Sequence, residues 1–450
     1  MSKTKSIRKK VITLMEEKNY KAIKKVFSKL KPIDIAALFD NLPEKNIILL
    51  FRILPKDLAA ETFVEMDSEQ QEMLIKSFSD FELREVVNEL YIDDAVDIVE
   101  EMPANVVKRI LGNTDAKTRT LINELLKYPQ DSVGSIMTTE LIHLRSSMTV
   151  ADAITKVRRG AADTETIDTC YVTDNVRHLI GNVTIRTLLL SDDNAKISDI
   201  MEQDTISVNT VEDREEAVNL FAKYDLTVLP VVDKDMRLVG IVTVDDAIDV
   251  LQDETTEDIE KMAAITPTYK PYLKKTVLEI WKSRIPWLLI LMISAIFTGM
   301  IINYFEDALM ANLMLTAYIP MLMDSGGNAG SQASATIIRG LSLKEIGFGD
   351  TVRVVWKEFQ VSIMCGITLA AVNFIKLIVI DGIGIYVASV VCITLALTVF
   401  VAKVAGSILP IAAKRAGVDP TVVSSPFITT IVDTLSLIIY FQIAVVILGI

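Results

Sequence analysis

The sequence PFITTIVDTLSLIIYFQIAVVILGI, residues 426–450, decides the class of this fold, because it is long and apolar enough to cross a bilayer as a helix. One carboxylate, Asp433, lies inside it. A charged side chain at membrane depth costs about 2.5 kcal/mol or more, so it usually faces a bundle interior or an aqueous path. Asp433 is therefore the first candidate for a functional residue.

Polar neighbours place Asp433 on a stripe rather than alone. Spacings of three and four residues bring four other positions to the same helical face: Pro426, Thr429, Ser436 and Tyr440. Isoleucine, leucine and valine fill most of the remaining surface. A polar stripe with one anion is typical of a cation pathway. The alternative is a carboxylate that is protonated or that only pairs with a neighbouring helix.

Four further segments are apolar enough to span a membrane. Together with the first they predict an all-α domain of five spans, at about residues 285–305, 309–338, 356–380, 383–404 and 421–450. The second span contains Pro320, Gly326, Gly327 and Gly330, so we expect it to be kinked or partly unwound.

Basic residues in the connections predict the orientation of these spans. They lie before the first span, after the second and after the fourth, whereas the other two connections carry acidic residues and no basic one. The N-terminal part is therefore expected in the cytosol and the C-terminus outside. Lys376 and Lys403 lie near span ends, where we expect their ammonium groups to reach the membrane interface.

Charge divides the chain into two unlike parts. Residues 285–450 hold eight Lys or Arg and nine Asp or Glu, so nearly all of the net charge of −13 lies on residues 1–284. An acidic part lacks the basic face that nucleic acids require and suits cations. The three cysteines, Cys170, Cys365 and Cys392, have no metal-ligand spacing, which favours a reducing cytosol for the soluble part. No hydrolytic constellation stands out, so we do not expect an enzyme.

Residues 1–130 show short amphipathic helical patterns joined by acidic, proline-containing segments, such as IDIAALFDNLPEK at 33–45. That spacing predicts a small superhelical array of helix pairs, which generally serves as an interaction surface.

Residues 131–252 contain an internal repeat. IDTCYVTDNVRHLIGNVTIRTLL (167–189) aligns with LTVLPVVDKDMRLVGIVTVDDAI (226–248) at a shift of 59 residues. The repeat resembles a tandem pair of cystathionine-β-synthase (CBS) modules, an α/β fold whose pairs commonly bind adenine nucleotides such as ATP. The resemblance implies that Thr243 contacts phosphate and Asp246 contacts ribose in the second copy, whereas Thr187 replaces the acid in the first. An empty, structural cleft is the alternative.

An acidic run, DDAIDVLQDETTEDIEKMAAI at 245–265, precedes the first span and holds eight carboxylates up to its one lysine. A helix would stack four of them on one face: Asp246, Asp249, Asp253 and Glu257. Like charges so placed destabilise a helix by a few tenths of a kcal/mol per pair. The run therefore predicts a divalent-cation site, with a solvated linker as the alternative.

The whole chain resembles the MgtE family of magnesium channels. Two motifs carry this resemblance, PMLMDSGGNAGSQASATIIRG at 320–340 and PFITTIVD at 426–433. Asp324 departs from the first motif. The implied architecture is a multidomain membrane protein with a helical domain at 1–130, a CBS pair at 131–252, an acidic plug helix at 245–270 and a five-span pore domain at 271–450.

The resemblance also implies the function: a homodimer in the plasma membrane imports Mg²⁺ through a pore lined by the second and fifth spans. Asp433 would bind the ion. Oxygens for the hydrated ion are expected from Asn328, Thr429, Thr430, Ser325 and the backbone near Gly326. Cytosolic Mg²⁺ would close the pore through Asp93, Asp94, Asp97, Asp246, Asp249, Asp253, Glu257 and Asp258. The alternatives are transport of Co²⁺ or Mn²⁺, and a nucleotide sensor that transports nothing.

Overall fold

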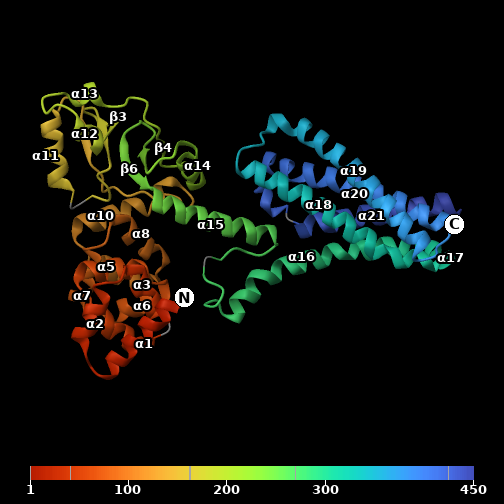
Figure 1. Ribbon diagram of the computed structural model, residues 1–450, viewed down its shortest axis with the longest axis horizontal. Helices are drawn as coiled ribbons and strands as arrows, with labels where there is room; N and C mark the ends of the chain where they lie inside the picture. The colour runs from red at the N-terminus through yellow and green to blue at the C-terminus, as the bar shows by residue number, and fades with distance from the viewer. Residues whose placement is uncertain (1, 41, 162–163, 269, 424, 450) are drawn as a thin grey trace. The chain divides into compact units, whose positions relative to one another are not determined.

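The computed structural model describes residues 2–40, 42–161, 164–268, 270–423 and 425–449 (Figure 1). The chain forms two compact units, residues 1–250 and 251–450. Each unit has its own hydrophobic core.

The first unit begins with a run of short helices, as the sequence predicts. They are α1 (Ser2–Glu16), α2 (Tyr20–Phe27), α3 (Pro32–Phe39), α4 (Glu44–Phe51), α5 (Lys56–Val64), α6 (Ser68–Ser77), α7 (Asp80–Val87), α8 (Ile92–Glu101), α9 (Ala104–Asn113) and α10 (Ala116–Leu125). Local sequence sets their starts. Pro43, Pro55 and Pro103 precede α4, α5 and α9, and Ser79 forms a reciprocal capping pair with Glu82 at α7.

Two three-stranded sheets follow, in the orders β1-β2-β3 and β4-β5-β6. The strands are β1 (His143–Arg145), β2 (Thr169–Thr173), β3 (Leu179–Thr184), β4 (Val208–Asn209), β5 (Val228–Val232) and β6 (Leu238–Thr243); the helices are α11 (Val150–Gly160), α12 (Ile185–Leu190), α13 (Ile197–Ile200) and α14 (Arg214–Tyr224). In both sheets the first pair is parallel and the second antiparallel. Val172 pairs with Gly181 and Val231 with Gly240, which confirms the repeat at its predicted shift.

The two paired glycines have a packing role. A Cβ atom on Gly181 would lie 2.6 Å from the Glu202 carbonyl oxygen, and one on Gly240 would lie 2.7 Å from the Thr138 carbonyl oxygen. Both distances are too short for a side chain, so glycine lets a neighbouring loop cross each strand at the equivalent point.

Helix α15 (Val244–Met262) continues directly from β6 and carries the acidic run. Beyond it lie α16 (Val277–Tyr304), α17 (Glu306–Ala311), α18 (Ile319–Ser342), α19 (Thr351–Val379), α20 (Ile385–Arg415) and α21 (Ser425–Leu448). Among the described residues, four helices are long and apolar enough to cross a membrane, namely α16, α19, α20 and α21. Helix α18 packs against α20 and α21 and is less apolar than these four helices.

The predicted unwinding of the second span is wrong: α18 is one continuous helix through all its glycines. Pro320 lies in the first turn, where a missing N–H breaks no helical hydrogen bond. The glycines allow close helix packing instead. A Cβ atom on Gly326 would lie 2.6 Å from Thr398 Cγ2, and one on Gly406 of α20 would collide with the Gly330 carbonyl oxygen. The backbone near Gly326 is therefore helical and is not an irregular lining for an ion.

The expectation for Lys403 is also wrong. Its side chain is 7% exposed and lies 3.8 Å from the Glu358 carboxylate of α19, so it is buried in the bundle instead of reaching the interface. Lys376 follows its prediction more closely, since it is half-exposed and pairs with Asp381 just beyond the end of α19. A buried ion pair inside an apolar unit holds two helices together only while both partners are present.

Candidate functional site

Asp433 lies in the middle of α21 and is half-buried. Its Oδ1 atom is buried and has no hydrogen-bond partner among the described residues. Asp324 of α18 lies within electrostatic range of it. A buried carboxylate oxygen without a partner is costly at membrane depth, so this environment favours a group that binds a ligand.

Helix α18 presents a polar stripe that the described residues leave exposed. The stripe consists of Asp324, Asn328, Gln332 and Thr336, spaced by four residues and all exposed. Polar groups at membrane depth need water or other protein around them. The stripe therefore marks a face for an aqueous path or for a second copy.

The α18 motif meets α21 next to this stripe. A Cβ atom on Gly327 would lie 2.6 Å from Thr429 Cγ2, so Thr429 packs directly on the glycine beside Asn328. The Thr429 hydroxyl donates to the Ser425 carbonyl oxygen at 2.7 Å and keeps a lone pair for another donor or an ion. The structure thus brings Thr429 and the Asn328 segment together.

The C-terminal half of the predicted α21 stripe belongs to the core. Ser436 is buried and its hydroxyl donates to the Val432 carbonyl oxygen. Tyr440 is buried and donates to the Leu315 carbonyl oxygen at 2.9 Å. Their hydrogen bonds are satisfied inside the protein, so they are structural and the candidate pathway includes only the Thr429–Asp433 half of the stripe.

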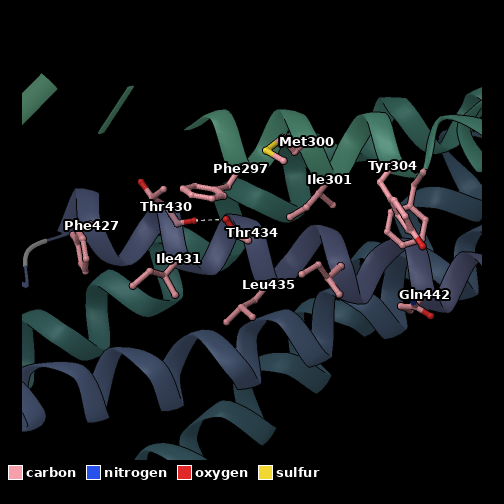
Figure 2. A pocket seen from close by; sticks show the side chains of 12 residues that line it. Phe297, Met300, Ile301, Tyr304, Phe427, Thr430, Ile431, Thr434, Leu435 and Gln442 are labelled. Atoms are coloured by element: carbon pink, nitrogen blue, oxygen red, sulfur yellow. Dashed lines mark hydrogen bonds between the residues drawn. The ribbon is translucent and has the colours of Figure 1, made fainter. Parts of the chain in front are cut away.

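Thr430 lies on a different surface. A groove of about 720 Å³ runs between α16 and α21, and Thr430 and Thr434 line it together with mostly apolar side chains. Figure 2 shows Phe297 and Met300 of α16 on the opposite side of this groove. Asp433 does not line it, although Thr430 lies only three residues before Asp433 on α21 and the two side chains project from neighbouring positions of the helix.

A second candidate site lies in the first unit. Asp93 of α8, Glu140 and Glu165 each place a carboxylate oxygen within 4.8 Å of the others. Asp93 Oδ1 and Glu165 Oε2 are buried without a hydrogen-bond partner among the described residues. Glu140 accepts a hydrogen bond from the Ile92 backbone N–H at 3.3 Å. Three converging carboxylates, two of which have a buried oxygen without a hydrogen-bond partner among the described residues, suit a hard divalent cation.

The carboxylates around this cluster carry like charges and repel one another. Burial, and then the nearby charge of Asp246, raises the pKa of Glu165 to about 7 and that of Asp94 to about 6. Burial followed by Asp94 raises the pKa of Asp93 well above its usual range. Asp97 lies one turn further along α8, and its pKa is raised to about 7 although its side chain reaches the surface. A cation bound here would relieve both desolvation and repulsion.

The predicted gating residues of α15 therefore fall into two groups along the helix. Asp246 joins the carboxylates of α8, and Asp249 acts electrostatically on Glu65, which follows the end of α5. Asp253, Glu257 and Asp258 lie further along the helix, where Glu257 pairs with Lys261. Sequence reasoning missed Glu140 and Glu165, because they lie in loops without periodicity and only the fold brings them to α8.

The two residues predicted to contact a nucleotide, Thr243 and Asp246, form a hydrogen bond with each other. Thr243 is buried and donates to Asp246 Oδ2 at 2.5 Å, while the equivalent Thr184 and Thr187 hydroxyls lie 2.9 Å apart. Burial raises the pKa of Asp246, and the hydrogen bond from Thr243 opposes that rise. A cleft of about 790 Å³ elsewhere in the unit is lined by α10 and the sheet loops, and it contains neither residue.

The chain matches three family models. They are "Divalent cation transporter" over residues 319–443, "MgtE intracellular N domain" over 30–131, and "CBS domain" over 133–192 and 197–253. Similar curated proteins are the magnesium transporter MgtE of Thermus thermophilus, 36% identical over 434 residues and 96% of each chain, and that of Bacillus subtilis, 34% identical over 442 residues, 97% of this chain and 96% of the relative.

Two solved structures resemble the soluble part. The cytosolic domain of the Mg²⁺ channel MgtE in complex with ATP is 36% identical with a TM-score of 0.52, covering 53% of this chain and 98% of that one. The soluble part of a magnesium transporter is 28% identical with a TM-score of 0.52, covering 56% and 99%. The likeness extends over helical array and sheets together.

Proposed function

Because the chain belongs to the MgtE family of divalent cation transporters, we propose that it is a channel-like importer of Mg²⁺ that cytosolic Mg²⁺ closes. The observation that carries this proposal is the Asp433 oxygen that has no hydrogen-bond partner among the described residues, together with the exposed polar stripe of α18. Mg²⁺ gives up its water reluctantly and accepts few direct carboxylates. Asp433 would hold a hydrated ion, and Asn328 and Thr429 would offer oxygens to its water shell.

We propose that the pore forms between two copies in the plasma membrane, with the soluble unit in the cytosol and the C-terminus outside. Each copy contributes one Asp433, so a pair provides two charges for a doubly charged ion. Helix α15 supports a paired assembly independently. Its exposed apolar side chains Val244, Ile248, Leu251 and Ile259 recur at helical spacing and would be covered by a second copy.

For closure, we propose that Mg²⁺ binds the carboxylates that meet around α8 and α15. The ion would link Asp93, Glu140 and Glu165 and neutralise the nearby Asp94 and Asp246. Without the ion, repulsion among these groups would loosen α15. The ligand shifts the gate only by its preference for the compact form. High cytosolic Mg²⁺ would then stop its own entry.

We also propose that the CBS pair binds an adenine nucleotide, since a similar cytosolic domain has been solved with ATP. The Asp246 carboxylate is then either a ribose ligand or a part of the metal site. Calorimetry on Asp246→Ala and on Lys117→Ala, which changes the 790 Å³ cleft, separates these roles. Loss of ATP binding in the first variant alone supports the ribose contact.

Flux into liposomes containing the purified protein tests the main proposal. With Mg²⁺ varied separately on each side, we expect Mg²⁺ entry that falls when Mg²⁺ is raised on the cytosolic face. Co²⁺ or Mn²⁺ entry without Mg²⁺ entry would instead favour another cargo. The absence of any divalent flux, with ATP binding intact, would favour a sensor that transports nothing.

A further inference from the structure

We propose that Lys261 is a positioning residue that ties the end of α15 to the loop leading into α21 and holds the closed form without a bound metal. The inference rests on the proposed gating by α15. Lys261 is the only basic residue in that helix. Its role is thus opposite to that of the carboxylates around it.

The contact joins segments that are distant in the chain. Lys261 Nζ donates to Asp419 Oδ2 at 2.7 Å across 158 residues, and it also pairs with Glu257 one turn back on α15. The two side chains of the longer contact are 24% and 37% exposed, so it is partly shielded from water. Burial disfavours the Lys261 cation, but the two carboxylates outweigh this and raise its pKa.

Asp419 is held in place from its own side. It caps the short η4 helix (Pro420–Val422) by accepting from the Thr421 N–H at 2.9 Å and from the Thr421 hydroxyl at 2.6 Å. Hydrogen bonds from Lys261 and Thr421 overcome the effect of burial and lower the pKa of Asp419. Asp419 is therefore a fixed, ionised acceptor, and the long Lys261 side chain is the adjustable partner.

The end of α15 is anchored on its other side as well. Glu260 accepts from the Thr268 N–H at 2.8 Å and pairs with Lys275 at 3.2 Å, just before α16 begins. The Thr266 N–H donates to the Ser283 carbonyl oxygen of α16 at 2.9 Å. These bonds hold α15 to the first span, whereas Lys261 makes its connection to the opposite end of the chain.

The Lys261 connection leads toward the candidate ion site. Asp419 is followed by η4 and then by Ser425, which begins α21 and whose hydroxyl donates to Ser331 of α18 at 2.7 Å. Asp433 lies about two helical turns further along α21. Release of Lys261 would therefore free the loop that sets the start of the helix carrying Asp433.

Two carboxylates around one cation also resemble a divalent-ion site. The direction in which Lys261→Gln moves half-closure therefore distinguishes a lysine that helps closure from one that competes with an ion. If Lys261 helps closure, Lys261→Gln opens the channel at low Mg²⁺ and moves half-closure to higher cytosolic Mg²⁺. For one partly shielded ion pair we expect a shift of about three- to tenfold. If Lys261 instead competes with an ion, the same variant would close at lower Mg²⁺.

The experiment compares Lys261→Gln, Asp419→Asn and the exchange Lys261→Asp with Asp419→Lys in liposome flux. Lys270→Gln is the matched control, since it breaks an exposed 3.3 Å pair with Glu279 in the next segment with the same loss of charge. We expect both single variants to shift half-closure upward, the exchange to restore it in part, and the control to leave it unchanged. An unchanged or lowered value in Lys261→Gln overturns the inference.

Proteolysis of the full-length protein by a glutamate-specific protease provides a readout that does not depend on flux. In Mg²⁺-free buffer we expect cleavage after Glu257 or Glu260 to be about three- to tenfold faster in Lys261→Gln than in the wild type. Equal cleavage in the two proteins refutes the contact even if the wild type transports Mg²⁺. If the wild type carries no Mg²⁺ but cleavage differs, the contact stands and the proposed function fails.

Discussion

At the scale of single residues, two charged positions in the membrane unit differ in what surrounds them. No described residue hydrogen-bonds to Asp433 Oδ1 or lies in an ion pair with that carboxylate, whereas Lys403 lies 3.8 Å from the Glu358 carboxylate. Sequence could identify Asp433 because the polar residues around it recur on one face. It could not distinguish a lysine that reaches the interface from one that is buried, because that depends on how α19 packs against α20.

Replacing Asp433 with asparagine keeps the size of the side chain and removes its charge. We expect Mg²⁺ flux to fall by at least tenfold, since a full charge no longer faces the ion, and Asp433→Ala to do the same. Flux is measured in liposomes at equal protein content, with Asn373→Ala on α19 as a control outside the candidate site. Wild-type flux in the asparagine variant would remove Asp433 from the pore.

Removing one member of the Lys403–Glu358 pair leaves a buried charge. We expect Lys403→Met alone to destabilise the membrane unit by about 3–5 kcal/mol, and the double variant with Glu358→Gln to recover most of that loss. Thermal unfolding in detergent measures both. A single variant as stable as the wild type would show that water reaches the pair.

At the scale of elements, sequence was reliable where a pattern repeats and failed where one residue type has two uses. The 59-residue shift predicted the strand pairs of both sheets. The glycines of α18 suggested unwinding because glycine favours both irregular backbone and close packing, and only the partners Thr398 and Gly406 reveal which applies. Loop carboxylates such as Glu140 gave no signal, since their neighbours are distant in sequence.

Neutralising the acidic face of α15 should weaken closure without damaging the pore. The variant changes Asp246, Asp249, Asp253 and Glu257 to their amides. It removes both the ligands and the repulsion, so the basal flux can change in either direction while the response to cytosolic Mg²⁺ shrinks. Flux against cytosolic Mg²⁺ measures this. Closure identical to the wild type would make α15 a solvated linker.

The raised pKa values around α8 predict how stability depends on pH. Asp94 titrates near 6 and Glu165 near 7 in the folded protein, above the usual carboxylate range of about 4. Their contribution is present below the unfolded pKa and is lost as pH rises through these folded values. We expect the metal-free unfolding temperature to fall between pH 5 and 8, and Mg²⁺ to raise it more at pH 8. Equal Mg²⁺ effects at both values would separate these groups from the metal site.

At the scale of the whole molecule, sequence predicted the domain types and the family, because both motifs occur after the expected soluble modules. It could not predict how copies of the chain associate, because that depends on surfaces that one chain leaves exposed. The apolar side of α15 is such a surface.

A charge on this apolar side should weaken the proposed dimer. We expect Ile248→Lys to lower the dimer fraction at least several-fold and to blunt closure by Mg²⁺, because a lysine would be buried between two helices. Val176→Lys is the control at a similarly exposed position in a turn. Native mass measurement in detergent provides the test, and an unchanged dimer fraction in Ile248→Lys would place the interface elsewhere.

The contact between Gly330 and Gly406 has a mechanical consequence. With no side chain between them, these two backbones pack in direct contact, and we expect α18 and α20 to move together as one frame. Any hinge of the membrane unit must therefore lie outside this frame. The start of α21 follows the short η4 helix and is joined to α18 by the hydrogen bond between Ser425 and Ser331, which makes it a candidate hinge. A gate built this way would move one wall of the passage while the other stays still.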